Sequence, residues 1–118
     1  MLIALRIALY IQVLLGLGRF FGFIANQRLW ETHISLGVLI AVLALLAMRP
    51  HPKAGNDAVR VLARFMPLIT LFVGLGLWQD VFVGRFAVMI HMLLGLISVG
   101  LVERAGAQER RAAAGRAG

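Results

Sequence analysis

Residues 61–79 read VLARFMPLITLFVGLGLWQ, an apolar run in which Arg64 is the only charged residue. A helix rises about 1.5 Å per residue, so about 20 apolar residues cross the roughly 30 Å hydrocarbon core of a bilayer. The run therefore predicts a transmembrane helix. Similar runs lie at 2–24, 30–48 and 86–102. The sequence thus predicts four transmembrane helices.

The overall composition supports this interpretation. Hydrophobic residues make up 61% of the 118 residues and charged residues only 14%, whereas about half of a soluble domain is apolar. Because the apolar runs are continuous rather than alternating, they predict helices and not the strands of a membrane barrel. The absence of cysteine excludes disulfides, thiolate metal sites, iron–sulfur clusters and covalently attached c-type haem. We expect an all-α integral membrane four-helix bundle in the lipid bilayer.

Basic residues lie unevenly about the four predicted helices. Nine fall on the side of the termini and three, Arg19, Arg28 and Arg85, on the other. Because cytoplasmic loops are rich in Lys and Arg, both termini are predicted to be cytoplasmic, in a multi-pass protein of the cell (inner) membrane. The net charge of +7 does not indicate a nucleic-acid partner, because no interleaved aromatic residues or recognition motif accompany it. The nine are Arg6, Arg49, Lys53, Arg60, Arg64, Arg104, Arg110, Arg111 and Arg116.

The predicted transmembrane domain covers residues 1–103. Residues 104–118 contain almost no large apolar side chains and several arginines. We expect them to form a basic cytoplasmic tail, a partly frayed helix end at the anionic inner surface of the membrane. A docking segment for a protein partner is the alternative.

An internal repeat divides the chain into two helical hairpins, 2–48 and 60–104. A shift of 58 positions aligns them, and each half reads Gly-Leu-Gly, fourteen residues, then His-x-x-Leu-Gly. Because each hairpin enters and leaves on the same side, the halves should be related by a two-fold axis along the membrane normal, which puts the two histidines at one depth. The matched residues are Gly16, Gly18, His33 and Gly37 in the first half and Gly74, Gly76, His91 and Gly95 in the second.

The paired histidines are the candidate cofactor ligands. An ionisable residue inside a transmembrane helix is costly and is a functional candidate by default. Neutral imidazole binds haem iron, and two histidines from facing helices supply both axial ligands of a haem b. The sequence therefore predicts haem b, near the outer surface, with its iron bound by His33 and His91.

The repeated glycines fit this hypothesis, because a flat porphyrin enters a helical bundle only where side chains are small. On the first and third helices these residues are Gly16, Gly18, Gly74 and Gly76. Gly37 and Gly95 leave room one turn beyond each histidine. Ordinary packing of small residues between helices explains the glycines equally well.

Anionic haem propionates require cations, and three arginines lie on the same predicted side as the histidines. Arg19 is the preferred partner, Arg85 is the second candidate and Arg28 the third. For Arg28 and Arg85, contact with lipid headgroups is the favoured alternative. Trp30 and Trp78 are expected to be interfacial anchors.

Other roles for the histidines stay open. They could be polar links between helices, which need only a hydroxyl or carbonyl partner such as Thr32 or Ser98. Each could instead bind the magnesium of a chlorophyll-type pigment. A zinc or copper site is a weaker alternative, because Glu31, Met89 and Met92, the extra ligands nearby, do not repeat between the halves. The third histidine, His51, lies in a polar loop and is expected to be solvated.

Residues 31–37 (ETHISLG) and 90–95 (IHMLLG) resemble the ligand-bearing helices of four-helix membrane haem proteins. The chain is similar to one half of a haem A synthase and, more loosely, to cytochromes of the b561 type. The resemblance implies a four-helix fold and a haem held near the membrane surface by His33 and His91. The chain has the length of one half only and lacks the outer-loop cysteines of many haem A synthases. What the resemblance implies is a minimal haem-binding bundle.

The leading functional hypothesis is a membrane-bound b-type cytochrome that passes electrons between a quinol and an outer or embedded partner. No residue set identifies a quinone site or a catalytic group. The alternative is a non-catalytic accessory subunit of a respiratory or photosynthetic complex, with or without a bound pigment. Because so little of the chain lies outside the membrane, we expect a membrane redox partner, a larger complex or a homodimer under both hypotheses.

Overall fold

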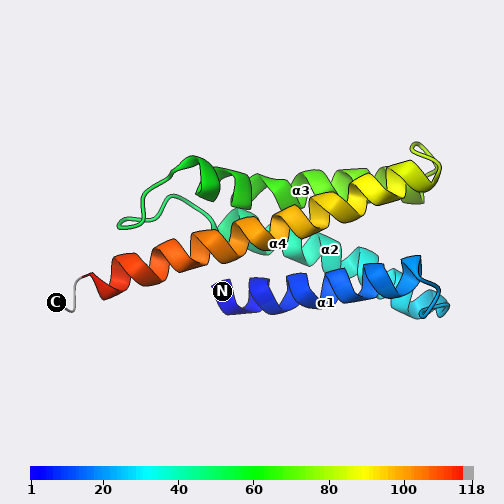
Figure 1. Cartoon of the computed structure of the whole chain (residues 1–118), viewed down its shortest axis with the longest axis horizontal. Coiled ribbons are helices and arrows are strands. Elements are labelled where there is room, and N and C mark those ends of the chain that lie inside the picture. Colours follow the sequence, from blue (N-terminus) through cyan, green and yellow to red (C-terminus); the bar gives the residue numbers. More distant parts are fainter. Residues whose placement is uncertain (116–118) are drawn as a thin grey trace.

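The computed structural model describes residues 1–115, which form four helices (Figure 1). Apart from one isolated bridge between His51 and Gly55, this part of the chain has no β-structure. Each helix is long and apolar enough to cross a bilayer. The prediction of an all-α chain with four such helices is confirmed, and Arg116 of the predicted tail lies outside the described residues. The helices are α1 (Leu2–Phe20), α2 (Gln27–Ala47), α3 (Ala58–Trp78) and α4 (Arg85–Ala114).

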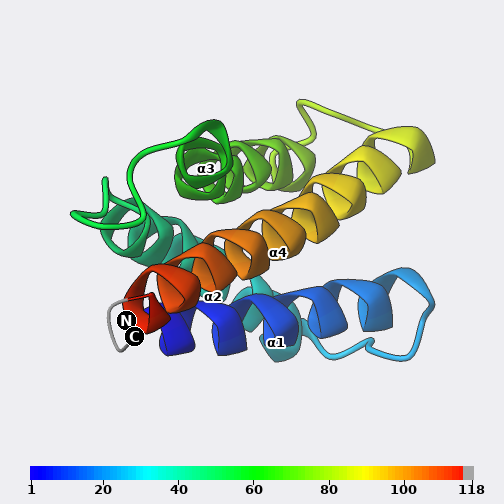
Figure 2. The same ribbon diagram turned by 60° about the vertical axis from the view of Figure 1, so that its left-hand side comes forward.

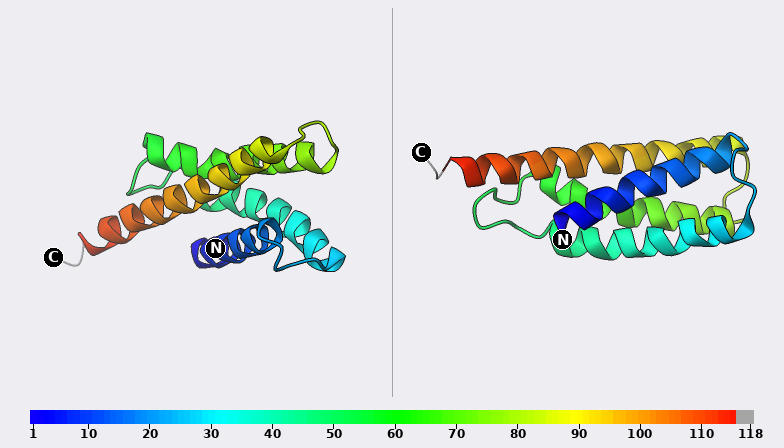
Figure 3. Two further views of the ribbon diagram at one scale, coloured as in Figure 1. Left: turned by 45° about the vertical axis from the view of Figure 1, so that its right-hand side comes forward. Right: turned by 90° about the horizontal axis from the view of Figure 1, so that it is seen from below.

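The helices form an antiparallel four-helix bundle with extents of 51 × 23 × 19 Å. Each helix packs against two neighbours, in the order α1, α2, α3, α4 and back to α1, so α2 and α4 lie diagonally opposite each other. The loops 21–26 and 79–84 both lie at one end, which we call the hairpin end. The N-terminus and the loop 48–57 lie toward the other, the terminal end (Figure 3).

The two loops at the hairpin end begin with the same turn. In both, the second glycine of the Gly-Leu-Gly motif accepts two backbone hydrogen bonds from the turn that follows. One pair of residues with positive φ also matches, since Gly22 has φ 80° and Asp80 has φ 55°, whereas Gly84 (φ 93°) is matched by Asn26 (φ −72°). The sequence repeat is therefore accompanied by a repeated turn. The bonds run from Phe23 and Ile24 to Gly18, and from Val81 and Phe82 to Gly76.

The buried apolar residues lie near the terminal end, in the first halves of α1 and α3 and the second halves of α2 and α4. Half of them are alanines, which let helices approach closely. Toward the hairpin end the α1–α2 pair diverges from the α3–α4 pair (Figures 2 and 3). The bundle is therefore closed at one end and splayed at the other. The buried residues are Leu5, Ala8, Leu9, Ile40, Ala41, Ala44, Met48, Ala63, Val102 and Ala105.

Two matched arginines join the hairpins. Arg6 of α1 donates from Nε and Nη2 to the carboxylate of Glu103 on α4, at 2.6 and 2.9 Å. Arg64 of α3, 58 positions later, donates from Nε to the backbone carbonyl of Leu45 on α2 at 3.1 Å. Leu45 and Glu103 are also 58 positions apart. The contacts between hairpins thus repeat in the way that an approximate two-fold axis requires.

Helix α4 continues well past residue 102, where the predicted apolar run ends, and reaches Ala114. Two contacts attach this extension to the start of α3. Gln108 donates from Nε2 to Asp57 at 2.7 Å, and the Glu109 carboxylate lies 2.8 Å from Nη1 of Arg60. The backbone N–H of Arg60 and the Gln108 amide hold the pKa of Asp57 below its ordinary value. The first part of the predicted tail is therefore a packed helix.

Removing the Arg60 side chain should destabilise the terminal end. Its guanidinium is buried, pairs with Glu109 and donates to the carbonyls of Ala47 and Arg49. We expect Arg60→Ala to lower the free energy of unfolding by about 2 kcal/mol, because it leaves these acceptors unpaired. Detergent-induced unfolding followed by circular dichroism measures this. Arg104→Ala, at an exposed position on α4, is the control; equal losses in the two variants would refute the assignment.

Candidate functional site

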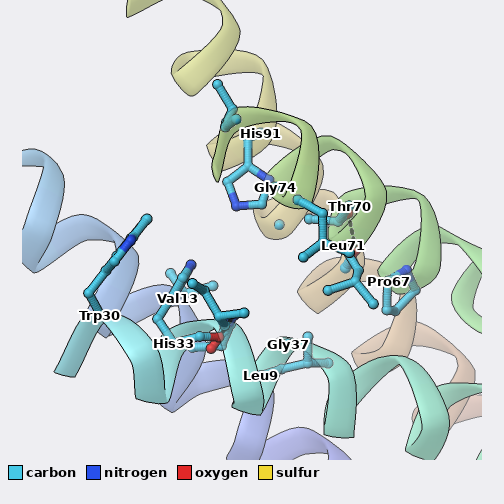
Figure 4. A pocket seen from close by; sticks show the side chains of 16 residues that line it. Leu9, Val13, Trp30, His33, Gly37, Pro67, Thr70, Leu71, Gly74 and His91 are labelled. Carbon is cyan, nitrogen blue, oxygen red and sulfur yellow. Dashed lines mark hydrogen bonds between the residues drawn. The ribbon is translucent and has the colours of Figure 1, made fainter. Parts of the chain in front are cut away.

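The two matched histidines face each other inside the splayed half of the bundle (Figure 4). His33 projects from α2 and His91 from α4, the diagonally opposite helices, so both side chains reach into the space between the hairpins. Their ring centres are 6.3 Å apart and their planes are inclined by 79°. His33 is only 8% exposed. A single chain therefore brings the predicted pair together.

The distance between the two ring centres can be compared with the distance expected when both imidazoles bind one metal ion. An imidazole nitrogen binds a metal ion at about 2 Å, and the ring centre lies about 1 Å behind that nitrogen, so one ion between two opposed rings places their centres about 6 Å apart. The observed 6.3 Å agrees with this value. Two metal macrocycles, one on each histidine and stacked about 3.5 Å apart, would require about 10 Å. The two rings are therefore too close together for two stacked macrocycles to lie between them.

The imidazoles retain unpaired polar atoms. Within residues 1–115, Nδ1 of His33 and Nδ1 of His91 are buried and have no hydrogen-bond partner. The backbone of Gln12 lies beside His33 and that of Thr70 beside His91, but neither contact has hydrogen-bond geometry. Gln12 and Thr70 are matched positions of the repeat. The two imidazoles therefore lie beside matched backbone positions of the neighbouring helices.

The hydroxyl partners suggested for a polar link, those of Thr32 and Ser98, bond to other groups. Thr32 donates from Oγ1 to the carbonyl of Arg28 at 2.9 Å, on the same helix. Ser98 donates to the carbonyl of Leu94 at 2.9 Å and contacts the hydroxyl of Thr70 at 3.3 Å. Neither hydroxyl bonds to a histidine. The side chains proposed as partners of the imidazoles are therefore already engaged elsewhere.

The first glycine of each Gly-Leu-Gly motif makes room for an imidazole. A Cβ on Gly16 would lie 3.3 Å from Cε1 of His33, and a Cβ on Gly74 would lie 2.7 Å from Cε1 of His91. Since Cβ atoms essentially never approach within 3.0 Å of another group, the position of His91 depends on the missing side chain at Gly74. These glycines thus place the histidine rings directly.

The second glycine of each motif has a different role. A Cβ on Gly18 would lie 2.6 Å from the side chain of Ile24, and one on Gly76 would lie 2.5 Å from the ring of Phe82. Neither glycine is among the residues that border the space around the histidines. The structure therefore places Gly18 and Gly76 in the last turns of α1 and α3, packed against the loops at the hairpin end.

A largely apolar space surrounds the histidines, and we call it the central cavity. It has three adjoining parts, all bordered by both His33 and His91, with cavity volumes of about 80, 70 and 360 Å³. The part nearest the terminal end is lined by residues of all four helices, including Leu9, Val13 and Leu71. The largest part is bordered by the loop 79–84 at the hairpin end. The cavity therefore leads from the histidines toward that end of the bundle.

The three candidate arginines lie in different places. Arg19 borders the mouth of the central cavity, and its guanidinium lies over the ring of Trp30 at 5.6 Å. Arg85 lies over the ring of Phe20 at 5.2 Å and is not among the residues that border the cavity. Arg28 lies on the outer surface of α2. Arg19 is thus the candidate that could meet an anionic group at the mouth.

The glycines one turn beyond the histidines also differ. A Cβ on Gly37 would lie 3.1 Å from Nε2 of Gln12 and 3.5 Å from Leu71, whereas nothing lies within 4 Å of a Cβ on Gly95. Both glycines border the central cavity. Only Gly95 of this pair leaves the open space that the sequence had suggested for both.

Two residues at the site were not predicted from the sequence. Trp30, which we expected to anchor the chain at the interface, stacks on His33 with ring centres 5.1 Å apart and planes inclined by 9°. Gln12 donates from Nε2 to the carbonyl of His33 at 2.8 Å, and its Oε1 is buried without a partner. The spacing of Trp30 and His33, one turn apart on one helix, could have indicated the first contact. The polar Gln12 within an apolar helix could have indicated the second.

The remaining metal-ligand candidates do not gather around the histidines. Met92 borders the central cavity, but Met89 is exposed and Glu31 lies on the outer surface of α2. Residues 1–115 contain no group of three or more His, Cys, Asp or Glu side chains that could hold a metal ion. His51 is far from the site and accepts hydrogen bonds from two backbone N–H groups of its own loop, at 3.2 and 3.0 Å. It therefore stabilises the loop.

No family model, no curated protein and no solved structure matches this chain.

Proposed function

We propose that the protein is a membrane-bound b-type cytochrome that holds one haem b between His33 and His91 and transfers electrons. The observation that carries the proposal is the pair of opposed imidazoles, from diagonally opposite helices, with ring centres 6.3 Å apart. A bis-histidine site requires only two protein ligands, because the porphyrin supplies the other four nitrogens. A bare zinc ion takes four ligands, and the described residues supply no such group.

The residues around the histidines are suited to this cofactor. Bound haem would supply a one-electron redox centre at its iron. His33 and His91 would hold the iron, and the apolar lining of the central cavity would exclude water from it. Arg19 at the mouth would pair with a propionate. Because two protein ligands would hold the iron, the site would suit electron transfer.

The electron donor and acceptor belong to the same proposal. We expect a quinol on one side of the reaction and a membrane-embedded or outer redox partner on the other. The helices carry many exposed large apolar side chains, including Leu14, Phe72 and Leu93, which lipid or a neighbouring subunit would cover. A larger complex or a homodimer is consistent with this surface.

The proposed orientation puts both termini in the cytoplasm of a cell with an inner membrane and the hairpin end outside. Nine basic residues at the terminal end and three at the other support it. The chain has no cysteine, so single introduced cysteines report the topology cleanly. In intact cells or spheroplasts, a membrane-impermeant thiol reagent should label Arg28→Cys and leave Lys53→Cys unlabelled until the membrane is opened. The reverse pattern would overturn the orientation.

Haem titration tests the cofactor. Protein in lipid nanodiscs, mixed with increasing haem, should develop a sharp Soret band that saturates at one haem per chain. Saturation at two per chain would favour a separate group on each histidine and would contradict the shared iron. A broad absorbance that does not saturate and equals that of empty nanodiscs would contradict haem binding. The accessory-subunit alternative would then replace the proposed function.

A further inference from the structure

The two histidines occupy matched positions in the repeat, but their surroundings differ. Three comparisons between positions 58 residues apart show this. Each concerns a group that fixes His33 and has no counterpart at His91. The comparisons rest on the packing of the chain alone.

The first difference is an aromatic partner. Trp30 stacks on the His33 ring with nearly parallel planes. The guanidinium of Arg19, on α1, lies 5.6 Å from the centre of the Trp30 ring. The matched residues in the second half are Val88 and Leu77. Neither can stack on an imidazole or supply a cation. The His33 ring is therefore held from one face, whereas the His91 ring has no such support.

The second difference is a hydrogen bond. Gln12 of α1 donates to the backbone carbonyl of His33 at 2.8 Å and so ties that turn of α2 to the neighbouring helix. The matched Thr70 of α3 bonds to the carbonyl of Met66, on its own helix, at 2.9 Å, and contacts the hydroxyl of Ser98, two turns beyond His91 on α4, at 3.3 Å. The turn of α4 that carries His91 therefore lacks this tie.

The third difference is free space. One turn beyond His33, the side chains of Gln12 and Leu71 fill the volume above Gly37. One turn beyond His91, nothing lies within 4 Å of a Cβ on Gly95, and Gly95 borders the same parts of the central cavity as His91. The His91 ring thus has room to swing toward Gly95 and away from Gly74, against which it is tightly packed.

We propose that the two histidines are unequal ligands, with His33 the fixed one and His91 the one that exchanges, so that a small neutral diatomic molecule can bind at the iron on the α4 side. This inference rests on the proposed haem site and adds a ligand-binding activity to it. When His91 leaves, its nitrogen keeps its electron pair, and the incoming molecule donates a pair to the same position. No electron or proton is gained or lost. Carbon monoxide is the probe for this class of ligand.

The first experiment measures carbon monoxide binding to reduced, haem-loaded protein in nanodiscs. In the wild type, the observed rate should level off at high carbon monoxide concentration, because release of His91 limits it. In His91→Ala, loaded with excess haem, the rate should rise linearly with concentration, and the haem affinity should fall by on the order of tenfold. In His33→Ala the haem affinity should fall by on the order of 100-fold, because the supported ligand is lost.

A second pair of variants keeps both histidines, so a change in carbon monoxide binding cannot be caused by the loss of a histidine. Gly95→Val fills the free space beside His91 and should slow carbon monoxide binding by on the order of tenfold, with unchanged haem content. Gly100→Val is the matched control. It lies on the same helix, also has nothing within 4 Å of a Cβ, and is not among the residues that border the cavity. It should bind carbon monoxide at the wild-type rate.

Tryptophan fluorescence of haem-free protein tests whether Trp30 stacks on His33. In a Trp78→Phe background the remaining tryptophan is Trp30, whose stacking on His33 should quench its fluorescence. His33→Ala should raise this fluorescence, and His91→Ala should leave it unchanged.

The possible failures are distinguishable. Haem-loaded protein in which His33→Ala and His91→Ala retain equal haem and bind carbon monoxide alike would overturn the inequality and leave the haem site intact. Equal rates in Gly95→Val and the wild type would also overturn it. A wild-type protein that takes up no haem would overturn the proposed function and this inference together.

Discussion

Under the proposed function, replacing either cavity histidine with alanine is expected to abolish the absorption spectrum of a six-coordinate, low-spin haem. His33 and His91 lie on opposite sides of one space, with ring centres 6.3 Å apart, and no other His, Cys, Asp or Glu of residues 1–115 joins them in a possible metal site. Each variant therefore leaves the iron with one protein ligand. Absorption spectra of haem-loaded His33→Ala and His91→Ala, oxidised and reduced, measure this change.

The third histidine supplies the control for these variants. His51 lies in the loop at the terminal end and accepts hydrogen bonds only within that loop. His51→Ala should keep the full low-spin spectrum. A low-spin spectrum that survived in both cavity variants would show that the haem is bound elsewhere, and so would a loss of equal size in His51→Ala.

A methyl group added at Gly74 is expected to displace His91. The new Cβ would lie 2.7 Å from Cε1 of the imidazole, which forces the ring to move. The matched change at Gly16 puts a Cβ 3.3 Å from Cε1 of His33, a contact that a shift of a few tenths of an ångström relieves. We expect Gly74→Ala to weaken haem binding by on the order of tenfold, and Gly16→Ala to weaken it much less.

Haem titration of the two glycine variants in nanodiscs measures this difference. The comparison is well matched, because the substitution is the same and the positions are 58 residues apart in the repeat. Gly100→Ala, in open space on α4, serves as a second control. Equal affinities in Gly74→Ala and Gly16→Ala would contradict the role assigned to the close contact at His91.

The number and type of the helices follow directly from the apolar runs, whereas their ends depend on contacts that a hydropathy pattern does not contain. Helix α3 begins at Ala58, before the predicted residue 61, because the Asp57 side chain caps it by accepting from the backbone N–H of Arg60. Helix α1 ends at Phe20 because Gly22 adopts a positive φ. Helix α4 is extended by polar contacts with α3, which no local pattern indicates.

The candidate site was predictable as far as it repeats. The shared register of His33 and His91 indicates two facing imidazoles. The matched Gly16 and Gly74 indicate a close approach to the helix backbone, and the groups that approach are the imidazole rings themselves. Trp30 could not be found in this way, because Val88 stands at its matched position. The repeat therefore predicts the symmetric part of the site, and the asymmetric part required the packing of the side chains.

Gly18 and Gly76 show that a repeated residue need not belong to the site. Gly18 and Gly76 repeat as well as the histidines do, but each accepts the backbone hydrogen bonds of a turn and lies under a side chain of that turn. A repeated residue can thus serve the shared fold or the shared site, and sequence alone does not separate the two roles.

The central claim is that one iron is shared by His33 and His91, and the reduced-minus-oxidised absorption spectrum of the purified, haem-supplemented protein tests it most directly. The account predicts sharp bands of a six-coordinate, low-spin b-type haem at one equivalent per chain. A spectrum that does not change on reduction, in protein shown to be folded by circular dichroism, would contradict it.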